Sequence, residues 1–304
     1  MRVAFTKILF NAAKRNKKIM LLAGDLGYSI FEPFIQKMPK QFINAGVAEQ
    51  NMTGMAAGLA IEGKIPVIYS IIPFATMRNF EQIRDDICYQ NLNVKIVGVG
   101  SGFSYGAYGH THHGLEDIGI LRTLANLIIF SPSDPREAES VTKWALKHIG
   151  PVYIRLGKAG EPILNPKSQF EFGKGSVIKE GKDVTIFSTG SISANGLEAA
   201  NALEKMGIST ALISVHTIKP IDQELIIERA KKSKYIFTLE EHSVVGGLGS
   251  AVAEVIAENN LNVNFKIIGA PDRFTKRAGR QEYMREVNGL SSQKIVKFIS
   301  KIFK

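Results

Sequence analysis

The side chain best placed to do chemistry in this sequence is a single carboxylate, Glu49, at the start of a small, apolar stretch. The stretch runs from Asn44 to Gly63, and after Glu49 its apolar residues recur at helical spacing. Gly54 and Gly58 would let another backbone approach, so we expect the helix to be buried on most sides. A lone carboxylate in such an apolar environment is unfavourable unless a polar group hydrogen-bonds to it.

A second group of polar side chains lies in a glycine-containing segment, residues 106–117. His110, His112 and His113 fall close together there and could suggest a metal site. We do not predict one, because no Cys or acidic partners of a metal site are gathered near them. A His in such a loop can instead contact substrate oxygens and help move protons.

Strands and helices alternate along the whole chain, and they must position these side chains. Mainly apolar runs at residues 19–23, 94–99 and 152–155, the last two with one charged residue each, indicate strands of a parallel sheet that is covered on both faces. We also expect a helix over about residues 77–90.

The chain changes composition between Gly157 and Gly181, where Gly, Pro and Lys are frequent. A second alternation of strands and helices follows. The fold class predicted is therefore α/β, with two consecutive α/β domains and mainly parallel sheets. We place the first domain at residues 1–165, a linker at 166–181 and the second domain at 182–304.

Composition is that of an ordinary soluble protein, with 304 residues, 45% hydrophobic and 22% charged. The net charge of +10 comes from scattered Lys without interleaved aromatic residues. We therefore expect no nucleic-acid site, although anionic substrates would benefit from the positive field. A single Cys, Cys88, fits a reducing cytoplasm. No signal peptide or apolar run of membrane-spanning length is found, so we expect no membrane partner.

Two motifs carry a family resemblance that extends over essentially the whole chain. Gly46-Val-Ala-Glu-Gln-Asn-Met52, followed by a Gly- and Ala-rich helix, resembles the pyrimidine-binding domain of transketolases and deoxyxylulose-phosphate synthases. Thr238-Leu-Glu-Glu-His-Ser-Val-Val-Gly-Gly-Leu-Gly-Ser250 is similar to the C-terminal domain of transketolases. The resemblance implies a pyrimidine-type domain followed by a transketolase C-terminal domain.

The resemblance also implies the cofactor, thiamine diphosphate, and a role for the acid. In the family, the residue that matches Glu49 hydrogen-bonds N1′ of the aminopyrimidine. Sharing that proton favours the imino tautomer, which removes the C2 proton of the thiazolium. The ylide then attacks a ketone, and the cofactor holds the later carbanion as an enamine. Glu49 is thus the expected catalytic and cofactor-binding acid.

Further cofactor contacts are implied by position. Asp25 follows the first strand, and in transketolases the similar residue lies near the cofactor and the dimer interface. Phe74 matches the aromatic ring that stacks on the pyrimidine, whereas Phe80 falls on a helix face with core residues. His112 matches the family His or Gln beside the thiazolium, as a catalytic and cofactor-contacting residue. His110 and His113 receive no role.

Candidates for the substrate's anionic end also come from the resemblance. Arg2 and Ser29 match phosphate contacts, and Lys158 replaces an Arg of the same site, keeping the charge without the bidentate fork. Tyr108 stands where many transketolases have an Asp that reads the donor sugar, and Gly100 stands in place of a His. These departures support the thiamine machinery better than any particular ketose.

One part of the family pattern is absent from the sequence. Diphosphate and Mg²⁺ are held in the family by a separate domain with a Gly-Asp-Gly motif and a later Asn, and Gly24-Asp25-Leu26 does not match it. The chain resembles the C-terminal half of a split transketolase. We therefore expect an N-terminal-half partner subunit that ligates Mg²⁺, and a heterotetramer built on a homodimer of this chain.

The resulting hypothesis is a subunit of a two-component transketolase that moves a two-carbon ketol unit between sugars or phosphosugars. Alternatives are a β-subunit of a 2-oxo acid dehydrogenase and a deoxyxylulose-phosphate-synthase-like enzyme. Against the dehydrogenase alternative, the Ala48-Glu-Gln-Asn-Met52 and Thr111-His-His-Gly114 patterns are closer to transketolases. A non-catalytic scaffold subunit is a third possibility, against which Glu49, Phe74 and His112 argue.

Overall fold

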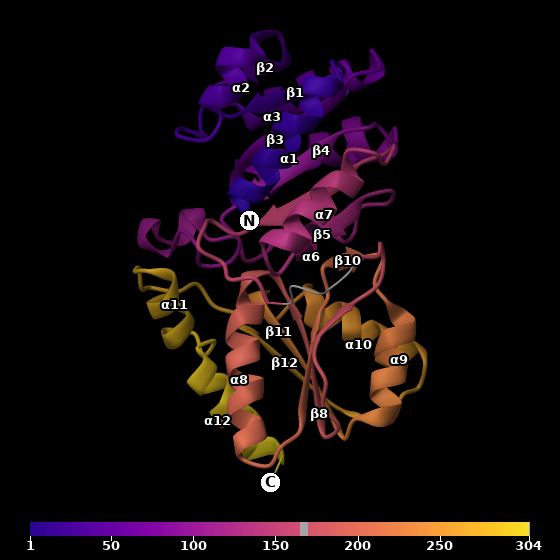
Figure 1. Ribbon diagram of the computed structural model, residues 1–304, viewed down its shortest axis with the longest axis vertical. Coiled ribbons are helices and arrows are strands. Elements are labelled where there is room, and N and C mark those ends of the chain that lie inside the picture. The colour runs from indigo at the N-terminus through magenta and orange to yellow at the C-terminus, as the bar shows by residue number, and fades with distance from the viewer. Residues whose placement is uncertain (165–169, 304) are drawn as a thin grey trace.

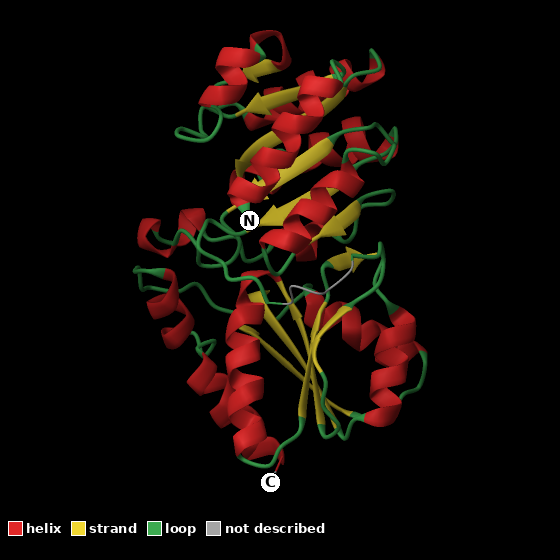
Figure 2. Ribbon diagram, viewed as in Figure 1, coloured by secondary structure: helices red, strands yellow, loops and turns green. Residues whose placement is uncertain are grey.

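The computed structural model describes residues 1–164 and 170–303. It contains two α/β domains that follow one another along the long axis of the molecule, the first in indigo to magenta and the second in orange to yellow (Figure 1). Each domain has a mainly parallel sheet flanked by helices (Figure 2). The predicted fold class is therefore confirmed.

The first sheet has seven strands in the order β10-β5-β6-β4-β3-β1-β2, and only β10 runs antiparallel to its neighbour. β1, β4 and β6 are buried along their whole length, as their mainly apolar sequences indicate, and the burial includes Lys95 of β4 and Arg155 of β6. The six strands that the first domain itself contributes are β1 (Ile19–Ala23), β2 (Phe42–Asn44), β3 (Ile65–Ile71), β4 (Lys95–Val99), β5 (Ile128–Phe130) and β6 (Val152–Leu156).

Helices of the first domain pack on both sides of this sheet. α1 and α7 contact each other on one face, while α3 packs against β1 and β3 and its buried residues join a separate core cluster. The helices are α1 (Arg2–Arg15), α2 (Glu32–Lys37), α3 (Glu49–Ile61), α4 (Ile72–Thr76), α5 (Phe80–Gln82), α6 (Asp117–Leu121) and α7 (Pro135–Ala145).

The helix expected over about residues 77–90 is found over residues 80–89, as α5 (Phe80–Gln82) continuing directly into a π-helix, and only its predicted start is wrong. α4 ends at Thr76, the chain turns before α5, and a π-helical turn follows over Ile83–Tyr89. Asn79, which is fully buried, stabilises the turn because its side-chain amide donates to Thr53 Oγ1 at 2.7 Å. A tertiary hydrogen bond to α3 therefore holds the turn that precedes this helix and shifts its start from residue 77 to Phe80.

The expectation that α3 is buried on most sides is also wrong for the chain by itself. Gly54 and Gly58 are exposed, and a Cβ atom added at either would meet open space. Ile61, at the end of the same helix, is 63% exposed. On α3, the buried side chains are thus those that face the sheet and the helical segment over residues 80–89.

Helix α7 is not among the predicted elements, although its start has a clear sequence signal. The Asp134 side chain accepts hydrogen bonds from the backbone N–H groups of Arg136 and Glu137, and Pro135 occupies the first helical position. Both features are typical of a helix N-terminus.

The second sheet has five strands in the order β12-β11-β8-β9-β7, and β7 is its antiparallel edge. Helices flank it as in the first domain (Figure 2). Its strands are β7 (Ser176–Lys179), β8 (Val184–Thr189), β9 (Thr210–Ser214), β11 (Tyr235–Ser243) and β12 (Asn264–Ala270), and the helices are α8 (Ser193–Lys205), α9 (Gln223–Lys232), α10 (Leu248–Glu258), α11 (Gln281–Val287) and α12 (Ser292–Phe303).

One strand from the second half of the chain joins the sheet of the first domain. β10 (Thr217–Lys219) comes from the second half of the sequence but pairs with β5 of the first sheet. Of the predicted linker, residues 166–169 lie outside the described part of the structure, as does residue 165 before them, and residues 176–179 form β7. The exact domain boundaries remain a prediction.

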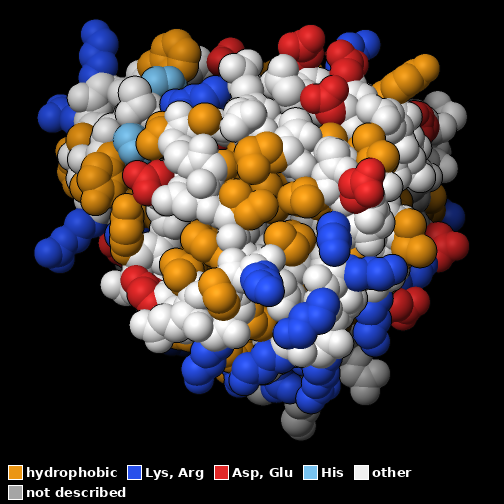
Figure 3. Space-filling view, turned by 90° about the horizontal axis from the view of Figure 1, so that it is seen from above, with side chains coloured by type: hydrophobic (Ala, Val, Ile, Leu, Met, Phe, Trp, Pro, Cys, Tyr) orange, Lys and Arg blue, Asp and Glu red, His pale blue; other side chains and the backbone are white. Residues whose placement is uncertain are grey.

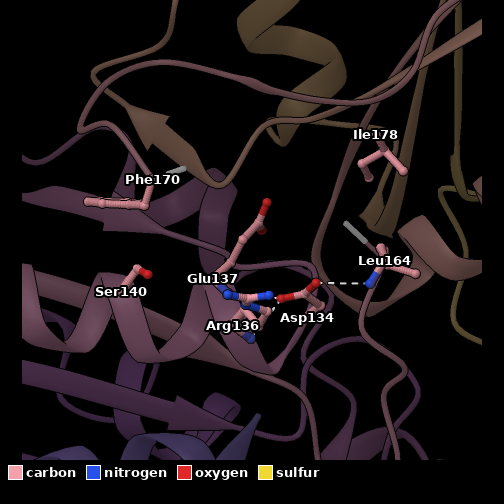
Figure 4. Close-up of a pocket in the computed structure, with 7 residues that line it drawn as sticks. All are labelled: Asp134, Arg136, Glu137, Ser140, Leu164, Phe170 and Ile178. Carbon is pink, nitrogen blue, oxygen red and sulfur yellow. Dashed lines mark hydrogen bonds between the residues drawn. The ribbon is translucent and has the colours of Figure 1, made fainter. Parts of the chain in front are cut away.

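A small cavity lies at this junction between α7, β7 and the connecting segment (Figure 4). Asp134 accepts a hydrogen bond from the backbone N–H of Leu164 at 2.9 Å, and Glu137 projects from the same helix turn. Phe170 and Ile178 contribute apolar walls. Side chains from both domains therefore meet here.

A buried ionic network also joins the domains and fixes the glycine-containing loop after β4. Arg155 Nε donates to Asp117 at 2.8 Å, and Arg155 Nη2 donates to the carbonyl oxygens of Gly114 and Glu241 at 2.7 and 3.0 Å. The Glu241 carboxylate in turn accepts from the Phe103 backbone N–H at 2.9 Å and from Arg285. The loop is thus held at both of its ends.

Within residues 1–164 and 170–303, every helix is too short or too polar to span a bilayer.

Candidate cofactor site at the carboxyl ends of the first sheet

Glu49 lies at the first turn of α3, shortly beyond the end of β2, and is 1% exposed. Its Oε1 accepts a hydrogen bond from Ser70 Oγ at 3.0 Å, and its Oε2 accepts one from Arg78 Nη1 at 2.8 Å. Gly24, just after β1, leaves room for the acid, since a Cβ there would lie 3.3 Å from Oε1. Adjacent parallel strands therefore deliver one buried carboxylate to this edge of the sheet.

Phe74 lies on α4, next to the group that binds the acid. The guanidinium carbon of Arg78 is 4.5 Å from the centroid of the Phe74 ring. The His112 ring meets the same Phe74 ring edge-on, with centroids 5.2 Å apart. Glu49, Arg78, Phe74 and His112 thus form a continuous series of contacts.

His112 belongs to a short 3₁₀ turn over His110–His112 and is half-buried. Its Nδ1 is 3.0 Å from Thr111 Oγ1, and its ring is 5.2 Å from that of Tyr108. Tyr108 is 66% exposed, so it stands at the open side of the site. A substrate entering here would meet a phenol and an imidazole before it met the buried acid.

His110 and His113 make their ring contacts outside this series. The His110 ring packs against Phe274 of the second domain, with centroids 4.4 Å apart. His113 is buried and packs edge-on against Phe103. Burial lowers the pKa of His113, which favours the neutral imidazole. Among the described residues, no group of His, Cys, Asp and Glu side chains could hold a metal ion.

Two of the predicted anion-binding residues lie near a tyrosine to which the sequence assigned no role. Lys158 Nζ lies 5.2 Å from the centroid of the Tyr105 ring. Burial raises the pKa of Tyr105 and of Tyr69, and the nearby Arg2 guanidinium opposes the rise at both phenols. Arg2 and Lys158 therefore both lie near Tyr105.

Asp25 and Ser29 occupy a different place, beyond the end of β1. Asp25 is exposed and accepts hydrogen bonds from Asn44 Nδ2 at 3.0 Å and from the Tyr28 hydroxyl at 3.2 Å. Ser29 donates its backbone N–H to Glu32 and lines an apolar groove between α1 and α2. These contacts bring neither residue to the series that runs from Glu49 to His112.

Two residues of the site, Ser70 and Arg78, received no role from the sequence. Ser70 lies within a strand pattern and has the signature of an ordinary buried position. Arg78 lies four residues after Phe74, so a helical segment would place both side chains on one face. That spacing was the available signal, but it does not identify the carboxylate that Arg78 binds.

The residues present fit one end of thiamine diphosphate. A planar aminopyrimidine needs a hydrogen-bonding acid at its ring nitrogen and an aromatic face, which Glu49 and Phe74 offer. The Arg78 guanidinium, itself planar, already lies against both. Fold and site together define a two-domain α/β protein with a half-site for a planar heterocycle.

Comparison with known proteins agrees with this class. Residues 1–160 match the family "Transketolase, pyrimidine binding domain", and residues 173–295 match "Transketolase, C-terminal domain". The chain is 40% identical to one subunit of the apulose-4-phosphate transketolase of Actinobacillus succinogenes, over 87% of this chain and 85% of that protein. It is 38% identical to a 6-deoxy-6-sulfo-D-fructose transketolase subunit of Clostridium sp. strain MSTE9, over 98% of this chain and 92% of that protein.

Solved structures that resemble this chain are also transketolases. A protein described as "Split gene transketolase, inactive beta4 tetramer" is 41% identical, with a TM-score of 0.87, over 98% of this chain and 96% of that one. The Campylobacter jejuni transketolase is 20% identical with a TM-score of 0.79, over 99% of this chain and 46% of that one, which shows the shared fold.

The chain belongs to the transketolase family and carries the family's pyrimidine-binding and C-terminal domains. It is thus a subunit of a thiamine-dependent transferase that acts with a partner subunit.

Proposed function

We propose that this chain supplies the pyrimidine half of a thiamine diphosphate site and takes part in moving a two-carbon ketol unit between phosphorylated sugars. The observation that carries the proposal is the buried Glu49 carboxylate beside the Phe74 ring, on the edge of the sheet where α/β proteins bind ligands. When bound, thiamine diphosphate supplies the nucleophilic carbon and the electron sink for cleaving a bond next to a ketone.

Each residue of the half-site then has a distinct task. Glu49 binds the ring nitrogen of the pyrimidine and holds the proton there, while Ser70 fixes the carboxylate through Oε1. Phe74 stacks on the pyrimidine and excludes water from it. His112 contacts substrate oxygens from the loop side. To Asp25 we assign a position near the cofactor and the dimer interface.

The anionic end of the substrate is assigned to Arg2, Ser29 and Lys158, and Tyr108 contacts the sugar at the open side. The position of Arg2 and Lys158 near Tyr105 supports this assignment for two of the three residues. The net charge of +10 would draw a phosphorylated sugar toward the site.

The partner is an N-terminal-half transketolase subunit that ligates Mg²⁺ and the diphosphate, and the active species is a heterotetramer in the cytoplasm around a homodimer of this chain. The exposed Gly54 and Gly58 on α3 support a helix-to-helix contact, since small residues allow close approach. Figure 3 shows hydrophobic side chains gathered near the middle of the face seen from above, at the end of the molecule formed by the first domain.

The test is ketol transfer by the assembled complex. The chain is mixed with its N-terminal-half partner, Mg²⁺ and thiamine diphosphate, and a set of ketose phosphates is offered with an aldose phosphate acceptor. We expect products longer by two carbons, seen by mass spectrometry, and a loss of at least about a hundredfold in rate for Glu49→Gln, which cannot hold the proton. Full turnover by Glu49→Gln would favour a scaffold role, and decarboxylation of 2-oxo acids without ketol transfer would favour the dehydrogenase alternative.

A further inference from the structure

The Glu49 carboxylate of this chain is already paired. Arg78 Nη1 donates to Glu49 Oε2 at 2.8 Å, and the same guanidinium lies over the Phe74 ring at 4.5 Å. A guanidinium is planar and cationic, and it both donates hydrogen bonds and stacks on aromatic faces. It therefore makes the same two contacts that the proposed function assigns to the aminopyrimidine.

The buried charge of Glu49 explains why a cationic group lies beside its Oε2 atom in the free chain. Glu49 is buried, and Ser70 satisfies only one of its two oxygens. A buried carboxylate without a partner is strongly unfavourable, so the free chain is stabilised by a counter-charge at Oε2.

Arg78 is able to leave. Its side chain is 43% exposed, whereas that of Glu49 is 1% exposed. It also comes from the turn between α4 and α5, so its reorientation would break no backbone hydrogen bond of a long helix. The guanidinium can therefore move into solvent while the carboxylate stays in place.

We infer that Arg78 is a built-in occupant of the pyrimidine site, which it fills in the cofactor-free chain and vacates when the cofactor enters. The inference rests on the proposed function, because it takes the pyrimidine to bind at Glu49 and Phe74. Two consequences follow. The free chain is more stable with Arg78 than without it, and cofactor affinity is lower with Arg78 because only the fraction with the side chain swung out can bind.

The first test measures cofactor affinity. Arg78→Met keeps the length of the side chain and removes its charge, and Arg84→Met is the matched control, since Arg84 is 63% exposed and pairs with Asp85. Binding of thiamine diphosphate with Mg²⁺ is measured by calorimetry on the complex of this chain with its partner subunit. We expect a dissociation constant about three- to tenfold smaller for Arg78→Met and unchanged for Arg84→Met.

Either of two results would overturn the inference while leaving the proposed function intact. An unchanged dissociation constant would mean that Arg78 does not compete with the cofactor. A larger one would mean that the guanidinium helps to hold the bound cofactor. Failure of the parent complex itself to bind thiamine diphosphate would instead contradict the proposed function.

A second test uses the chain alone and needs no cofactor. Thermal unfolding is compared for the parent, Arg78→Met, Glu49→Gln and the double variant. We expect Arg78→Met to lower the melting temperature at pH 8 in the parent background and to have little effect in the Glu49→Gln background, because no buried charge is left unpaired there. Equal effects in both backgrounds would show that Arg78 does not stabilise the free chain through Glu49.

Discussion

The ring of His112 meets the ring of Phe74 edge-on, with centroids 5.2 Å apart. The two residues come from different elements, α4 and the loop after β4, and Phe74 also contacts the guanidinium that binds Glu49. One aromatic ring therefore connects the buried acid to the half-buried imidazole. Substitutions at Phe74 should consequently alter the surroundings of both Glu49 and His112.

We expect Phe74→Leu to weaken thiamine diphosphate binding by the assembled complex. A lost stacking contact is worth about 0.5–1.5 kcal/mol, which corresponds to a roughly two- to twelvefold larger dissociation constant. The comparison is best made in the Arg78→Met background, where no guanidinium competes for the ring.

Phe80→Leu is the control for that experiment, since Phe80 packs against the buried core. It should lower the melting temperature and leave the dissociation constant unchanged. If Phe80→Leu weakens binding and Phe74→Leu does not, the stacking ring has been assigned to the wrong residue.

Lys158→Met should raise the KM for a phosphorylated substrate by roughly tenfold, since an exposed charged contact lies at the low end of such interactions. Turnover at saturation should change little, because the contact is the same in the ground and transition states. Lys147→Met, also an exposed Lys of the first domain, is the control. A fall in kcat with no change in KM would remove Lys158 from the anion site.

The junction between the domains should weaken as pH rises. Burial raises the pKa of Glu137 to about 7, against an ordinary value of 4.5, despite hydrogen bonds from the Ser133 backbone N–H and Ser214. Because the folded-state pKa is the higher one, the protonated acid stabilises the fold below pH 4.5, and this contribution is lost as pH rises through about 7.

Glu137→Gln tests this directly, since the amide stays neutral at every pH. We expect the variant to be more stable than the parent at pH 8, by a few kcal/mol at most, and the difference to shrink toward pH 4.5. Urea unfolding at several pH values measures it. A parent whose stability rises between mildly acidic and mildly alkaline pH, relative to Glu137→Gln, would contradict the assignment.

Gly54→Leu should disrupt assembly and leave the folded chain intact. The added side chain meets open space within the chain, and Leu has a better helix propensity than Gly. If α3 packs against a second copy, the variant should elute as a smaller species in size-exclusion chromatography with light scattering. Asn201→Leu, on the exposed side of α8, is the control. An unchanged mass for Gly54→Leu would place the interface elsewhere.

The sequence predicted those parts of the fold that depend on local pattern. β1 was expected at residues 19–23 and is found there, because a continuous apolar run between polar residues has few other solutions. The start of α3 at Glu49 was also expected and is found there. Local pattern was insufficient where distant residues decide, as at Asn79, whose hydrogen bond to Thr53 holds a turn where the start of the next helix was expected.

Residues of the candidate site could likewise be predicted only where a sequence motif identifies them. Glu49, Phe74 and His112 were named from their motifs, and the structure brings them into one series of contacts. The contact between Arg78 and Glu49 was missed, because it depends on the turn between α4 and α5 that places the guanidinium. The pairing of β10 with the first sheet was missed for a similar reason, since no local signal marks a strand that crosses between domains.

The most direct measurement is thiamine diphosphate binding by calorimetry in the presence of Mg²⁺, on this chain alone and after addition of the N-terminal-half partner. The half-site offers an acid and a ring for the pyrimidine, and the sequence lacks the motif that holds the diphosphate. We therefore predict binding only in the mixture. Tight binding by the chain alone would contradict the account, because it would require a diphosphate site within these two domains.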